Sequence, residues 1–186
     1  MASEGHIDVS IIIPMLNEAE SLPELFARIK SVLIELEKEF EVIFVDDGSS
    51  DGSADVVKEL RLHDVRAKLI EFRKNYGKAA ALAAGFKMAN GDVVITMDAD
   101  LQDDPDEIPN LLNKLNEGFD LVSGWKKVRH DPFIKRQTSK VYNFFTSIFS
   151  GIRLHDFNCG LKAYRSEVVK RDRKSTRLNS SHRYVS

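Results

Sequence analysis

Short runs of consecutive apolar residues recur along the chain, and a segment with helical periodicity follows most of them. Five such runs read as strands, at residues 8–14, 40–45, 67–72, 92–97 and 120–125. Because these runs are continuously apolar and do not alternate with polar residues, both faces of the sheet must be covered. The sequence therefore predicts an α/β fold with a mostly parallel central sheet and helices on both faces.

Helical patterns fill the intervals between these strands. The first helix is predicted to begin at Ser21, with Glu24 at the position that completes a capping box. Further helices are expected at residues 54–63, 77–89, about 105–117 and 134–151. This regular succession, without a linker or an internal repeat, predicts one domain.

The periodicity stops near Arg171, where Ser, Arg and Asn become frequent. Residues 171–186 contain five Lys or Arg residues and one Asp. We expect the domain to span residues 1–170 and the remaining segment to be a non-native or disordered tail. A genuine basic tail is the alternative.

Composition excludes several classes of protein. The net charge of −2 argues against bulk affinity for nucleic acid, and Cys159 as the single cysteine precludes an intrachain disulfide. The opening residues lack the apolar core of a signal peptide, and no apolar run approaches the ~18 residues that span a bilayer. The sequence as given predicts a soluble or peripheral protein.

Polar motifs follow four of the predicted strands. They are "PMLNE", "DDGSSD", "RKNYGK" and "DADLQ". Ligands of open parallel sheets bind outside the carboxyl ends of the strands. We therefore expect the four loops to form one site.

Asp98 and Asp100 follow directly on the fourth strand, and in an extended segment their side chains share one face. Two adjacent carboxylates favour a hard divalent cation such as Mg²⁺ or Mn²⁺, with Gln102 as a neutral oxygen ligand. The alternative is a solvated loop. That alternative suits the next four acids, which precede a helix and so complement its dipole, namely Asp103, Asp104, Asp106 and Glu107.

The other loops offer weaker signals. Asp46 and Asp47 end the second strand and could accept hydrogen bonds from a base or a ribose, although Asp is also common in turns. Asn17 and Glu18 could serve only to lead into the next helix. Lys78, with Arg73 and Lys74 nearby, lies at a predicted helix start that suits a phosphate group; the alanines there also suit close helix–sheet packing.

Taken in order, five segments resemble family 2 glycosyltransferases of the Rossmann-like GT-A fold, and among these the polyprenyl-phosphate sugar transferases. They are "SIIIPMLNE", "VIFVDDGSSDGS", "NYGKAAALAAGF", "GDVVITMDADLQDDP" and "HDFNCGLKAYR". The resemblance covers residues 8–170. Relatives continue with a further acceptor-side segment, so it also implies a catalytic domain truncated at its C-terminal side.

This resemblance implies a metal-dependent transfer from a UDP- or GDP-linked sugar that inverts the anomeric configuration. The metal, Mg²⁺ or Mn²⁺, would lie on the donor diphosphate and neutralise the leaving group. Asp98, Asp100 and Gln102 would be its ligands. The nucleotide-sugar pocket would comprise Pro14, Asn17, Glu18, Val45, Asp46, Asp47, Lys78 and Asp98.

Basic residues lie beside an aromatic helical pattern in residues 125–151. Such a pattern suits a lipid phosphate at a membrane surface, or a core-facing helix with a solvated basic face. The resemblance implies a polyprenyl phosphate acceptor at the cytoplasmic face of a membrane, held by Lys135 and by Ser139 four positions later. Lys126 and Arg129 are further candidates for the acceptor phosphate.

A hydroxyl acceptor on a glycan or another soluble molecule would instead require a general base. Asp156 is the candidate for that catalytic role, and a structural turn is its alternative. A third interpretation is a truncated chain that only binds a nucleoside diphosphate.

Overall fold

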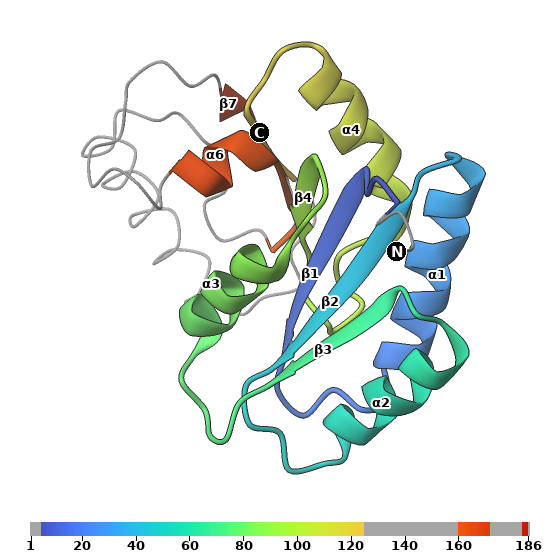
Figure 1. Ribbon diagram of the computed structural model, residues 1–186, viewed down its shortest axis with the longest axis vertical. Coiled ribbons are helices and arrows are strands. Elements are labelled where there is room, and N and C mark those ends of the chain that lie inside the picture. The colour runs from blue at the N-terminus through green and yellow to red at the C-terminus, as the bar shows by residue number, and fades with distance from the viewer. Residues whose placement is uncertain (1–4, 125–159, 172–183, 186) are drawn as a thin grey trace, which may run out of the picture.

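The computed structural model describes residues 5–124, 160–171 and 184–185, and in these residues seven strands form one sheet (Figure 1). The strands are β1 (Val9–Met15), β2 (Phe40–Asp46), β3 (Ala67–Glu71), β4 (Val93–Thr96), β5 (Leu121–Ser123), β6 (Lys162–Arg165) and β7 (Tyr184–Val185).

The sheet has the order β3-β2-β1-β4-β6-β5-β7. β3, β2, β1 and β4 run parallel, whereas β6 is antiparallel to both β4 and β5. The predicted mostly parallel sheet is therefore confirmed. β6, which separates β5 from β4, was not predicted, because its four residues "KAYR" form no apolar run.

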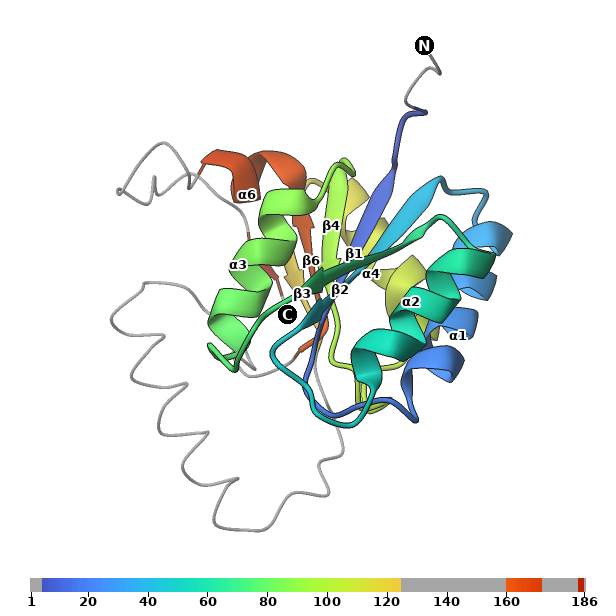
Figure 2. The same cartoon turned by 60° about the horizontal axis from the view of Figure 1, so that its bottom comes forward.

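The described helices are α1 (Leu22–Glu35), α2 (Ser53–His63), α3 (Lys78–Met88), the 3₁₀ turn η1 (Pro105–Glu107), α4 (Ile108–Asn116) and α6 (Ser166–Arg171). Figure 2 shows α1, α2 and α4 on one face of the sheet and α3 on the other. Helices therefore cover both faces, as predicted. The expected helix over 134–151 lies outside the described residues.

Alternate residues of β1, β2, β3 and β4 supply the two cores. On β1, Ile11 and Ile13 pack toward α1, α2 and α4, whereas Ile12 packs toward α3. A Cβ on Gly85 of α3 would lie 2.3 Å from Cγ2 of Ile12. The small residues of α3 thus allow a close approach to the sheet, as the sequence analysis inferred.

Two further predictions concern the start of the first helix and the C-terminal segment. The capping box predicted at Ser21 is wrong: no side chain caps α1, and Ser21 Oγ donates to the carbonyl of Glu18 at 2.9 Å. In the segment predicted to be a tail, Tyr184 and Val185 pair in parallel with β5. Most of that segment lies outside the described residues, and its assignment stays a prediction.

A buried carboxylate near the start of β2 is fully satisfied by its neighbours. Glu41 is 1% exposed and accepts from Ser10 Oγ at 2.6 Å and from the Asn90 N–H at 2.7 Å. It also forms an ion pair with Lys68. Burial alone would raise the pKa of Glu41, but these hydrogen bonds outweigh it and lower the pKa below its ordinary value of 4.5.

We expect Glu41→Gln to lower the free energy of unfolding by about 2 kcal/mol at neutral pH, since hydrogen bonds to charged groups contribute about 1.5–3 kcal/mol. Because the folded-state pKa is depressed, this contribution is complete above the unfolded-state pKa and is lost as the pH falls through the folded-state pKa. Urea unfolding of both proteins between pH 7 and pH 3 measures it. A difference that stays constant over this range would contradict the assignment.

Candidate active site

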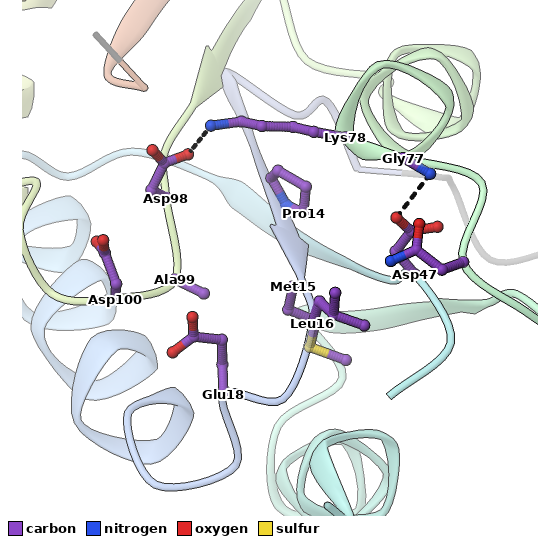
Figure 3. A pocket seen from close by; sticks show the side chains of 11 residues that line it. Pro14, Met15, Leu16, Glu18, Asp47, Gly77, Lys78, Asp98, Ala99 and Asp100 are labelled. Carbon is purple, nitrogen blue, oxygen red and sulfur yellow. Dashed lines mark hydrogen bonds and ion pairs between the residues drawn. The ribbon is translucent and has the colours of Figure 1, made fainter. Parts of the chain in front are cut away.

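A cavity of about 310 Å³ opens at the carboxyl ends of the parallel strands (Figure 3). It lies where the chain order of the sheet reverses, with β1 on one side and β4 on the other. This is the position at which open α/β sheets bind ligands. Its lining residues are Pro14, Met15, Leu16, Glu18, Asp47, Asn75, Gly77, Lys78, Asp98, Ala99 and Asp100.

Three carboxylates, those of Glu18, Asp98 and Asp100, line one part of this cavity (Figure 3). Asp100 Oδ1 accepts from the backbone N–H of Gln102 at 3.1 Å, which fixes the turn after β4. Burial, and next the negative charge of Asp100, raise the pKa of Glu18. The cavity therefore favours a bound positive charge.

One positive charge is already present. Lys78, the first residue of α3, reaches across the cavity and forms an ion pair with Oδ1 of Asp98 (Figure 3). Its side chain is 53% exposed, so it can change partner at little cost in burial. The N-terminus of α3 and this ammonium group together suit an anionic ligand such as a phosphate.

Asp47 holds the loop that precedes α3. Its two carboxylate oxygens accept from the backbone N–H groups of Tyr76 at 2.7 Å and Gly77 at 2.8 Å. Asp47 therefore shapes the wall of the cavity while lining it. Asp46 is 2% exposed, and its Oδ1 accepts from the N–H of Ser49 at 3.0 Å, which is ordinary turn geometry.

The loops after β1 and β2 are clamped together. The Asn17 side chain accepts from the N–H of Ser50 at 2.9 Å, and the Ala19 N–H donates to Asp51 Oδ2 at 3.0 Å. Ser53 Oγ accepts from the N–H of Glu18 at 2.9 Å. The motif "GSSDGS" thus fixes the backbone that carries Glu18.

The structure brings six predicted site residues to the cavity: Pro14, Glu18, Asp47, Lys78, Asp98 and Asp100. Four other predicted site residues do not line the cavity. The Asn17 side chain holds the loop after β2, and Asp46 closes a turn. Val45 is fully buried, and Gln102 is exposed to solvent. The predicted acceptor and base residues lie outside the described part of the chain, namely Lys126, Arg129, Lys135, Ser139 and Asp156.

Five lining residues were not among the predicted site residues. Met15, Leu16 and Ala99 lie between motif residues, and Asn75 and Gly77 belong to the loop held by Asp47. Only their positions within or beside the polar motifs could have indicated that they line the cavity.

The donor atoms fit a hard divalent cation, since Mg²⁺ and Mn²⁺ prefer oxygen ligands and often share them with substrate phosphates. Within residues 5–124 and 160–171, no group of three or more His, Cys, Asp or Glu side chains is arranged to hold a metal ion. Asp98 and Asp100 alone would supply too few ligands for such an ion, so a bound ligand would have to complete its shell.

The geometry defines an α/β domain with an acidic cavity and the N-terminus of α3 at the switch point of a mostly parallel sheet. The chain belongs to glycosyl transferase family 2, whose sequence profile matches residues 10–173. In the described part of the chain, no helix has both the length and the apolar character to cross a bilayer.

Similar proteins support this assignment. The chain is 40% identical over 163 residues to undecaprenyl-phosphate 4-deoxy-4-formamido-L-arabinose transferase of Pseudomonas aeruginosa, covering 87% of this chain and 48% of that protein. The corresponding Proteus mirabilis protein is 42% identical over 162 residues, covering 87% and 50%. The chain therefore spans about half the length of these curated relatives.

Among solved structures, a mannosyltransferase from Pyrobaculum calidifontis in complex with GDP-Man and Mn²⁺ superposes with a TM-score of 0.65. It is 26% identical, and the match covers 90% of this chain and 47% of that one. The GT-A fold expected from the sequence is thus confirmed.

Proposed function

We propose that this chain is the donor-binding part of a metal-dependent, inverting glycosyltransferase that moves a sugar from a nucleoside diphosphate to a polyprenyl phosphate. The observation that carries this proposal is the convergence of Glu18, Asp98, Asp100 and Lys78 on one cavity at the switch point of a family 2 sheet. The names of the curated relatives support the lipid phosphate acceptor.

Each side chain has a distinct role in this proposal. Asp98 and Asp100 would hold Mg²⁺ or Mn²⁺, which when bound neutralises the charge that develops on the departing diphosphate. Lys78 would leave Asp98 and bind a diphosphate oxygen. Asp47 and Pro14 would position the nucleoside of a UDP- or GDP-linked donor.

In the transfer step, an acceptor phosphate oxygen forms a bond to the anomeric carbon as the bond from that carbon to the donor diphosphate breaks. The configuration inverts, and the nucleoside diphosphate leaves with the bonding electron pair. A phosphate acceptor is already ionised near neutral pH and needs no general base. A hydroxyl acceptor would need one, and Asp156 would then be that base.

Turnover with undecaprenyl phosphate in detergent, Mn²⁺ and a panel of UDP- and GDP-sugars tests the acceptor. We expect a glycosyl phospholipid product, and we expect Asp156→Asn to bind nucleoside diphosphate as the parent does. The lipid-phosphate acceptor would be contradicted if the parent glycosylated only hydroxyl acceptors and if Asp156→Asn abolished that transfer with donor binding intact. Peripheral contact with the cytoplasmic face of a membrane belongs to the same proposal.

A further inference from the structure

Gly160 lies against the carboxylate of Asp98. An ideal Cβ placed on Gly160 would be 2.4 Å from Cγ and 2.5 Å from Oδ2 of Asp98. The same Cβ would be 2.7 Å from Oδ2 of Asp103. Real Cβ atoms do not approach this closely, so any other residue at position 160 would displace these acids.

The backbone of Gly160 is tied to the sheet and cannot simply withdraw. Thr96 Oγ1 donates to the Gly160 carbonyl at 2.8 Å, and Thr96 is 4% exposed. Two residues later, Lys162 opposes Thr96 in the antiparallel β4–β6 pair. The hydrogen bond to Thr96 and the β4–β6 pairing therefore hold Gly160 close to Asp98.

Asp98 is held at three points. Its Oδ1 pairs with Lys78 in the cavity, its Oδ2 faces Gly160, and its backbone N–H donates to Asp103 Oδ2 at 3.0 Å. Asp103 is 2% exposed, so this hydrogen bond lies in the protein interior. One oxygen of Asp98 is thereby directed toward the cavity, while the other is covered by the backbone.

We propose that Gly160 is a positioning residue, which acts through Asp98 and presents a single carboxylate oxygen to the cation. This inference rests on the proposed function, because it concerns the acid that would hold the metal. It assigns a role to a glycine of "NCGLKAYR" that carries no functional group of its own.

The test is Gly160→Ala in the full chain, with Mn²⁺ binding followed by electron paramagnetic resonance and by calorimetry with UDP and GDP. Residues that orient a metal ligand typically change metal affinity by about 10- to 100-fold, so we expect a loss of that size. The atoms that an added methyl would meet belong to side chains of Asp98 and Asp103. We therefore expect only a small shift in the urea midpoint.

Gly91→Ala is the matched control. A Cβ on Gly91 would lie 2.6 Å from the backbone N of Ser10 and 2.8 Å from the backbone C of Val9, far along the sheet from the cavity. Because backbone cannot move aside cheaply, this variant should lose more stability than Gly160→Ala. Its folded fraction should bind Mn²⁺ as the parent does.

Thr96→Val removes the hydroxyl that holds Gly160 and serves as a second variant if Gly160→Ala does not fold. Thr96→Val should also weaken Mn²⁺ binding, by a smaller factor than Gly160→Ala. Parental Mn²⁺ affinity in Gly160→Ala, or in Thr96→Val when the alanine variant fails to fold, would overturn the positioning role. Failure of the parent itself to bind Mn²⁺ with either nucleotide would instead overturn the proposed function.

Discussion

Asp98→Asn should lower Mn²⁺-dependent affinity for nucleoside diphosphates by about 100-fold or more, since even residues that only orient a metal ligand change affinity by about 10- to 100-fold. The substitution removes the negative charge but keeps the size of the side chain. It also removes the ion-pair partner of Lys78. Calorimetric titration of UDP and GDP, with Mn²⁺ and with EDTA, measures the effect.

Asp106→Asn provides the matched control for this prediction. Asp106 belongs to the same acidic stretch, but its side chain is 69% exposed and forms a 3.4 Å ion pair with Arg28 outside the cavity lining. This control should bind nucleotide as the parent does. Equal weakening by the two substitutions would mean that general negative charge, and not a ligand position at Asp98, attracts the cation.

Gly48→Ala is expected to lower the free energy of unfolding by about 3 kcal/mol, as the sum of about 1–2 kcal/mol for a left-handed backbone and a similar cost of overpacking. Gly48 has φ of +83°, and a Cβ there would lie 2.7 Å from the backbone C of Lys74 and 2.8 Å from the backbone N of Asn75. Because Asn75 lines the cavity, nucleotide affinity should fall as well. Urea unfolding and calorimetry test the two effects.

Gly52→Ala separates the backbone conformation from the clash. Gly52 has φ of +91°, but nothing lies within 4 Å of the position of its Cβ. Gly52→Ala should lower the free energy of unfolding only by the cost of the left-handed backbone, about 1–2 kcal/mol, and leave nucleotide affinity unchanged. Equal losses of stability in the two variants would contradict the close packing of the loops after β2 and β3.

The parallel part of the sheet could be predicted because its strands are buried on both faces and so read as unbroken apolar runs. β6 could not, since half of "KAYR" is charged and the strand is recognised only by its pairing with β4 and β5. The helix start at Ser21 was predicted correctly, but its hydroxyl donates to the carbonyl of Glu18 and accepts from no N–H of the first turn.

The candidate site also has features that the sequence predicts and features that it does not. The position of Asp98 and Asp100 beside the cavity could be predicted because a strand that ends in paired carboxylates needs compensation for their repulsion, and their metal-binding role stays a prediction. The separate functions of Asp46 and Asp47 could not, since only the folded loops show which acid closes a turn and which holds Gly77. Gly160 gave no chemical signal, because its role is the space it leaves beside Asp98.

The metal site can be tested directly by a crystal structure of the chain grown with Mn²⁺ and the nucleoside diphosphate that it binds, with the metal located by anomalous scattering. We expect a peak in the cavity within about 2.0–2.6 Å of a carboxylate oxygen of Asp98 or Asp100, with the diphosphate completing the shell. A nucleotide bound in the cavity with no metal beside either acid, or a peak elsewhere on the protein, would show that these acids do not hold the metal.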